Sequence, residues 1–88
     1  MNVKSREAAK EVLDHMPPWL GISPNTYKAS VMLFALRLPP EKLIEALWIA
    51  QARKPAGGMA GFKYFCGTAH GMYRELQRTR SRSRKARN

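Results

Sequence analysis

The sequence predicts an all-α fold, a compact bundle of about four short helices with a basic C-terminal tail. Apolar residues recur at spacings of three and four, the period of an amphipathic helix, and the alternation typical of strands is absent. Proline pairs and a glycine-rich stretch separate the apolar segments, as is usual where helices end and begin. A chain of 88 residues forms one domain. We therefore expect a helical domain at residues 1–77 and an Arg-rich C-terminal tail at residues 78–88.

The first helix is predicted to begin at Ser5, whose hydroxyl can cap it, and to run to about Met16. Its apolar side consists of Ala8, Ala9, Val12, Leu13 and Met16. Pro17 and Pro18 are expected to end it, because neither residue has an amide hydrogen to donate to the helix. The apolar residues at positions 19–22 would then form a short loop that plugs one end of the core.

Ser23 and Pro24 give a strong start signal for a second helix, a capping hydroxyl followed by proline at the first helical position. Residues 29–38 are apolar except for Ser30 and Arg37, and a proline pair follows them. A helix that is apolar nearly all round is normally surrounded by other helices. This segment is therefore predicted to be the central helix of the bundle.

A third helix is predicted to begin at Pro40, with Glu41 in its first turn, and to end before Pro55. Its buried stripe is expected to contain Leu43, Ile44, Leu47 and Trp48. The tight connection to the preceding helix is similar to that of a helix-turn-helix, whose second helix enters the major groove. Here Glu41 and Glu45 would bring two carboxylates close to phosphate, which disfavours that interpretation.

Residues 55–61 are expected to form a pliable loop, and a fourth helix to run from near Phe62 to Arg78 or beyond. The apolar side of this helix consists of Phe62, Phe65, Cys66, Ala69, Met72, Tyr73 and Leu76. From Thr79 onward no apolar residue is larger than Ala86. Because such a segment cannot stabilise itself by burial, it is predicted to be disordered alone or to extend the last helix in a frayed form.

The net charge is +10, and its distribution matters more than its size. Residues 78–88 contain six of the sixteen Lys and Arg residues and no acid, which leaves +4 on residues 1–77. This asymmetry indicates a nucleic-acid partner first and an anionic membrane second. A membrane partner is disfavoured, because the tail lacks an apolar half and no apolar run approaches the ~20 residues of a membrane span. A solubility tail or a localisation signal is the other interpretation of the basic block.

One side of the fourth helix leads into the basic tail. Steps of four, three, four and four residues place on a common face Lys63, Gly67, His70, Arg74 and Arg78. Tyr64 lies near the edge of this face and is a candidate to stack on a base. The predicted nucleic-acid-binding residues are this set and the tail cations: Lys63, Tyr64, Gly67, His70, Arg74, Arg78, Arg80, Arg82, Arg84, Lys85 and Arg87.

Gly67 and Gly71 are unfavourable inside a helix, by roughly 1 kcal/mol each relative to Ala. Two kinds of contact could offset this cost to helix stability, namely close packing of a neighbouring helix or close approach of a phosphate backbone. Helix packing is the commoner cause, and we expect it here.

The sequence offers little for catalysis or metal binding. Gly57, Gly58 and Gly61 lack the Gly-Lys-Ser/Thr ending and the preceding strand of a phosphate-binding loop, and no nucleophile motif occurs. Cys66 and His70 are four residues apart, but the chain lacks the further ligands of the common structural zinc sites. We therefore predict no enzymatic activity, no metal and no cofactor. The single cysteine favours a reducing, intracellular location, cytoplasmic or nucleoid-associated.

These observations predict a small, basic, non-enzymatic nucleic-acid-binding protein, with DNA favoured over RNA, that binds phosphates through its last helix and its Arg-rich tail. The alternative is a small helical structural subunit of a larger nucleoprotein complex, ribonucleoprotein or RNA-guided, in which other chains build most of the nucleic-acid channel. The apolar contact surface that such a subunit needs would serve a homodimer equally well.

Overall fold

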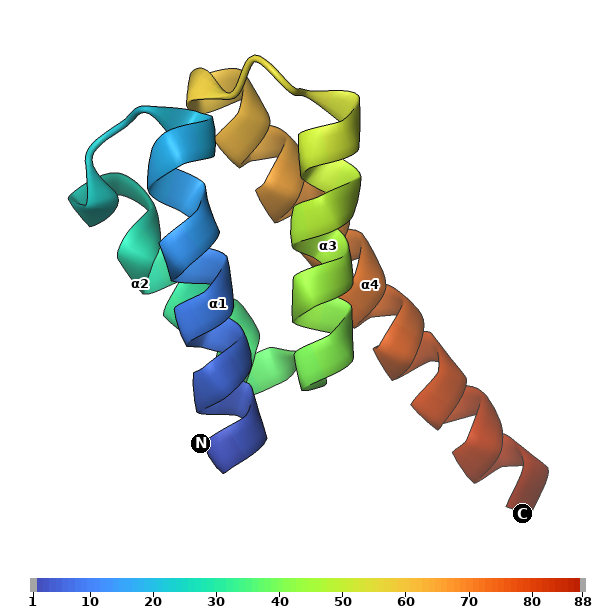
Figure 1. The fold of residues 1–88 in the computed structure, drawn as a ribbon. Coiled ribbons are helices and arrows are strands. Elements are labelled where there is room, and N and C mark those ends of the chain that lie inside the picture. Colours follow the sequence, from blue (N-terminus) through green and yellow to red (C-terminus); the bar gives the residue numbers. More distant parts are fainter. Residues whose placement is uncertain (1, 88) are drawn as a thin grey trace.

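The computed structural model describes residues 2–87, with side chains for residues 2–79. Its elements are α1 (Val3–Leu20), α2 (Pro24–Arg37), α3 (Pro40–Arg53) and α4 (Gly58–Arg87), and residues 2–87 contain no strand (Figure 1). α1 packs against both α2 and α3, and α3 also packs against α4. The last turns of α4 project beyond the other three helices (Figure 1). The predicted all-α fold of four helices is confirmed.

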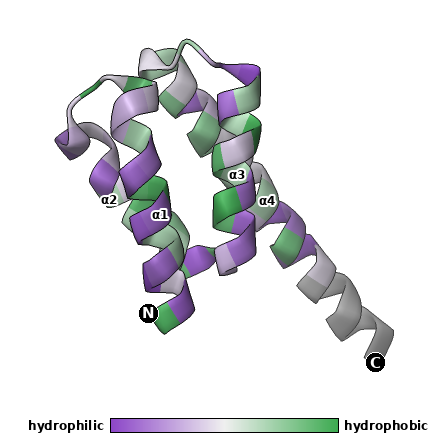
Figure 2. Ribbon diagram, viewed as in Figure 1, coloured by the Kyte–Doolittle hydropathy of each residue, from purple (hydrophilic) through white to green (hydrophobic). Residues whose placement is uncertain are grey.

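All four helices contribute to one apolar core. Met16, Val31, Leu43 and Phe65, one from each helix, are fully buried. Each such side chain stabilises the fold by about 1.5–3 kcal/mol relative to an exposed one. Hydrophilic and hydrophobic residues are interspersed along α1 and α3 (Figure 2), as expected for helices that turn one face to the core and the other to solvent.

The N-terminal cap of α1 is Asn2, and the prediction of Ser5 is wrong. The backbone N–H of Ser5 donates a hydrogen bond to the Asn2 side chain, with 2.8 Å between N and Oδ1. Ser5 itself is helical and buried, with 8 % of its surface exposed. Asn and Ser are both good N-terminal caps. The apolar repeat of α1 begins only at Ala8, too far from Asn2 to show that the helix starts there.

α1 does not end at Met16 as predicted, but continues through Pro17 and Pro18 to Leu20. The fixed φ of proline is compatible with a helix, but each proline lacks a donor and its ring crowds the carbonyl four residues earlier, which disfavours an interior position by about 3 kcal/mol or more. Burial of Leu20 and the hydrogen bond from Trp19 to Lys54 offset part of this cost. Gly21, at φ 65°, then ends α1 in the left-handed conformation, and its N–H donates to the Pro17 carbonyl.

The end of α1 packs against the connection between α3 and α4. The indole N–H of Trp19 donates to the Lys54 carbonyl at 2.8 Å. A Cβ on Gly57 would overlap the carbonyl oxygen of Trp19, and φ at Gly57 is 72°, so only glycine fits there. A Cβ on Gly61 would lie 3.1 Å from the Trp19 ring. The expected pliable loop is therefore a packed connection, and α4 begins at Gly58, four residues before the predicted start.

The predicted starts of the second and third helices are confirmed at Pro24 and Pro40. Ser23 caps α2, because its hydroxyl accepts a hydrogen bond from the Asn25 N–H at 3.4 Å. α3 ends at Arg53, where a cation is favoured by the helix dipole.

α2 is not the central helix, although it contains the most continuously apolar segment. It packs mainly against α1, and Leu33 and Leu36 remain 50 % and 61 % exposed. In a bundle of four helices each helix keeps one face toward solvent, so none can be surrounded. α3 is the more central element, since it packs closely against both α1 and α4.

Trp48 is 45 % exposed and does not belong to the buried stripe of α3 as predicted. The core side of α3 consists of Leu43, Ala46, Leu47 and Ala50. Trp48 lies beside this set, at the border of the face, where its ring packs edge-on against His15 with 5.1 Å between centroids.

Tyr27 provides a test of the core. Its side chain is 1 % exposed, and among residues 2–79 its hydroxyl has no hydrogen-bond partner. Burial raises the pKa of this hydroxyl, which stays neutral. The substitution Tyr27→Phe removes the unpaired group, and we expect it to raise the free energy of unfolding by about 1 kcal/mol, measured by urea denaturation.

The control is Tyr73→Phe. The Tyr73 hydroxyl accepts a hydrogen bond from the exposed Gln77 amide at 3.0 Å. Its loss should change stability by less than about 0.5 kcal/mol. A lower stability of Tyr27→Phe than of the unmodified chain would show that the Tyr27 hydroxyl has a partner in solution.

Candidate nucleic-acid interface

The sequence-predicted cationic face lies on the exposed side of α4. The register of α4 is fixed by Phe65 and Ala69, which are buried in the core. At 3.6 residues per turn, the opposite side carries residues that are all exposed, here called the α4 stripe: Lys63, Gly67, His70, Arg74 and Arg78. From Lys63 to Arg78 the stripe measures about 22 Å along the helix.

Tyr64 and Gly71 border the α4 stripe. Tyr64 is half-buried and packs against the core, so only part of its ring is available for stacking on a base. Its carbonyl accepts a hydrogen bond from the Thr68 hydroxyl at 2.9 Å. Gly71 is exposed. The structure thus places Gly71 with the stripe and Tyr64 at the boundary between stripe and core.

α2 contributes a cation that sequence reasoning missed. The Arg37 guanidinium lies over the Tyr73 ring of α4, 5.7 Å from the centroid. Near it, the exposed His70 packs edge-on against Phe34 of α2, with 5.0 Å between centroids. Arg37 therefore stands beside the α4 stripe. No local pattern in the sequence could indicate this, because the position depends on how α2 and α4 pack.

The prediction that helix packing compensates for Gly67 and Gly71 is wrong. A Cβ built on either residue has no atom within 4 Å other than those of its own helix. Close packing occurs instead at Gly57 and Gly61, against Trp19. No contact within the described part of the chain offsets the two glycines.

The charges are unevenly distributed among the helices. α1 has three cations and three acids, and α3 has two of each, so both carry no net charge. α2 carries Lys28 and Arg37 and no acid. Between Gly58 and Thr79, α4 has three cations and one acid, Glu75, which lies 3.7 Å from Arg78. Both partners of this ion pair are exposed, so it contributes little to stability.

Acidic side chains gather on the side formed by α1 and α3. A shallow groove between these two helices is lined by Lys4, Glu7, Ala8, Glu11, Pro40, Glu41 and Ile44. The net positive charge of the folded body therefore lies on α2, on α4 and on Lys54 in the connection between α3 and α4, and the groove between α1 and α3 has an excess of acids.

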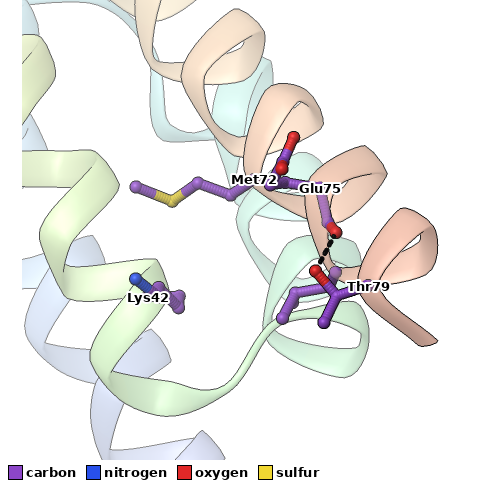
Figure 3. Close-up of a pocket in the computed structure, with 5 residues that line it drawn as sticks. Lys42, Met72, Glu75 and Thr79 are labelled. Atoms are coloured by element: carbon purple, nitrogen blue, oxygen red, sulfur yellow. Dashed lines mark hydrogen bonds between the residues drawn. The ribbon is translucent and has the colours of Figure 1, made fainter. Parts of the chain in front are cut away.

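A second groove lies between α3 and α4 (Figure 3). It has a volume of about 240 Å³ and is mainly apolar, with the lining Lys42, Met72, Glu75, Leu76 and Thr79. Lys42 pairs with Glu45 at 3.2 Å. The Thr79 hydroxyl donates a hydrogen bond to the Glu75 carbonyl at 3.0 Å (Figure 3).

Cys66 is half-buried, and burial raises the pKa of its thiol. The neutral thiol is a weak nucleophile and a weak metal ligand. In the part of the chain with described side chains, no three His, Cys, Asp or Glu residues come together to hold a metal ion. In the same part, no helix is both long enough and apolar enough to cross a membrane.

The predicted tail residues Arg80, Arg82, Arg84, Lys85 and Arg87 have side chains outside the described residues. The backbone of α4 continues through Arg87. Of the two states expected for the tail, disordered or an extension of the last helix, the structure has the extension.

Comparison of the chain with protein-family profiles, with curated protein sequences and with solved structures gives no match.

The glycines of α4 provide a test that separates exposed from packed positions. Because a Cβ meets open space at both sites, we expect Gly67→Ala and Gly71→Ala each to raise the free energy of unfolding by up to about 1 kcal/mol. Gly57→Ala is the matched contrast and should lower it by at least about 1 kcal/mol, because of the positive φ and the Trp19 carbonyl. Thermal and urea denaturation measure both effects. A loss of stability at Gly67 or Gly71 would contradict the open surroundings described above.

Proposed function

We propose that this chain is a small, non-enzymatic nucleic-acid-binding protein that binds phosphates through the α4 stripe and the Arg-rich tail, with DNA favoured over RNA. The observation that carries the proposal is the exposure of the whole α4 stripe, on a helix whose backbone runs on into the tail. Lys and Arg side chains pair with phosphate oxygens, and the nucleic acid releases condensed counterions. Such contacts position the protein without reading the base sequence.

The two exposed glycines support the same partner. Gly67 belongs to the α4 stripe, Gly71 borders it, and neither is contacted by another helix. A phosphate backbone that approaches here meets the helix backbone with no side chain between them. The cost of the two glycines to helix stability is then offset in the complex.

The arrangement of charges gives the complex an orientation. α4 and α2 carry most of the net positive charge of the folded body, and they turn toward a polyanion. The groove that contains Glu7, Glu11 and Glu41 is repelled by phosphate and turns away from it. The protein therefore binds with the sides of α1 and α3 facing solvent.

A second candidate function, a structural subunit of a larger nucleoprotein complex, is favoured by the outward face of α2. Leu33 and Leu36 are half or more exposed on this face, which suits a contact with another chain. A gel shift with the purified chain alone at ~150 mM salt separates the two functions. A shift of labelled duplex or single strands supports an independent binder, whereas no shift, together with retention in a co-purified complex, supports the subunit.

Deleting residues 78–88 tests the role of the tail. If its six cations all pair with phosphates, they contribute about −5 to the slope of log K against log salt concentration. The deletion should flatten the slope by that amount and weaken binding similarly for all base sequences. Binding is measured by fluorescence anisotropy between about 50 and 200 mM salt. An unchanged slope after truncation would remove the tail from the mechanism.

Arg74→Ala tests the α4 stripe. The loss of one phosphate contact should weaken binding and reduce the magnitude of the salt slope by about 1. Arg6→Ala is the matched control, because Arg6 is also exposed but lies on the net-neutral α1. The control should bind like the unmodified chain. Equal losses for the two variants would indicate a response to net charge alone and would exclude a defined binding face.

A further inference from the structure

α4 is longer than the fold needs. It has 30 residues, which at about 1.5 Å per residue gives a helix of roughly 45 Å. Its first half packs against α3 and the core, and its last turns project past the other helices (Figure 1). The helix therefore leaves the body of the protein with its backbone already formed.

The projecting part of α4 is strongly basic, and a helix of this composition is stabilised by an anion. Residues 80–87 contain five Lys and Arg residues and no acid. Like charges three and four residues apart destabilise a helix, and this segment has no large apolar residue whose burial could offset that repulsion. A polyanion that lies along the helix removes the repulsion and stabilises the extended form.

We propose, on the basis of the proposed function, that the partner is duplex DNA and that α4 lies in its major groove as one continuous helix. An α-helix with its side chains has a diameter of about 10–12 Å, and the major groove of B-DNA is about 12 Å wide. The major groove of duplex RNA is too narrow and deep for side chains to read. A single strand has no groove, so a flexible cationic segment would bind it as well as a continuous helix would.

The neighbourhood of the α4 stripe is suited to this arrangement. Gly67 and Gly71 leave open space on one side of α4, so the helix can come close to the edge of the groove. Arg37 stands beside the stripe on α2 and can contact a phosphate at the flank of the groove. Continuous basic helices bind the major groove in the same way in other DNA-binding proteins.

Ser81→Pro tests whether the helix must be continuous. Proline strongly disfavours a helix interior and removes no charge. Pro17 and Pro18 are held in α1 by the burial of Leu20, whereas residues 80–87 contain no large apolar residue that could hold a proline in the helix. The site lies in the last turns of α4, which project past the other helices (Figure 1), so we expect the fold to be retained. Ser81→Ala is the matched control, which has the same charge and favours the helix. On a 20-base-pair DNA duplex we expect the proline variant to bind at least about tenfold more weakly than the alanine variant, because the break separates the last turns of α4 from the α4 stripe.

A chemical footprint gives a second readout that needs no variant. Dimethyl sulfate methylates guanine N7, which lies in the major groove. The unmodified chain should protect guanines over roughly one turn of the duplex. Duplex RNA of the same sequence should bind more weakly than the DNA at equal salt.

The outcomes separate this inference from the proposed function. Equal affinity of the proline and alanine variants for duplex DNA, or binding without protection of guanine N7, would overturn major-groove insertion. The Arg-rich tail would then act as a flexible cation chain, and nucleic-acid binding itself would stand. If the alanine variant shifts neither duplex DNA, single-stranded DNA nor RNA, the proposed function fails together with the inference.

Discussion

The contact between Trp19 and the chain that precedes α4 is the constraint on which the rest of the structure depends. The Trp19 indole binds the Lys54 carbonyl, and the Trp19 backbone occupies the space that a side chain at Gly57 would need. This contact determines where α4 begins. Burial of Phe65 and Ala69 then fixes the rotation of α4 about its own axis, and every later position follows at 100° per residue. Phe65 then faces the core, and the α4 stripe faces outward.

Much of the fold could be predicted from the sequence, because the signals involved are local. The caps and prolines at Ser23, Pro24 and Pro40 determine where α2 and α3 begin, whatever these helices pack against. The three- and four-residue repeat of α4 separates its two sides in the same way. The exposure of the α4 stripe could therefore be predicted before its neighbours were known.

Apart from the cap of α1, where Asn2 and Ser5 were local alternatives, the predictions that were wrong depend on which helices are neighbours. Pro17 and Pro18 lie inside α1 because contacts made by Trp19 and Leu20 hold the extra turn, and those contacts reach residues more than thirty positions away. The apolar character of α2 suggested a central place, but a bundle of four helices has no such place. Arg37 joins the candidate site only through the packing of α2 on α4, which no local pattern records.

The uneven charge of the helices also has a kinetic meaning. α1 and α3 are electrically balanced, whereas α2 and α4 are positive, so the molecule has a permanent electric dipole. In the field of a distant polyanion this dipole experiences a torque, which rotates the protein during diffusion so that α4 arrives first. If the chain binds nucleic acid as proposed, productive encounters are then more frequent than random tumbling allows, and added electrolyte, which shortens the range of the field, slows association.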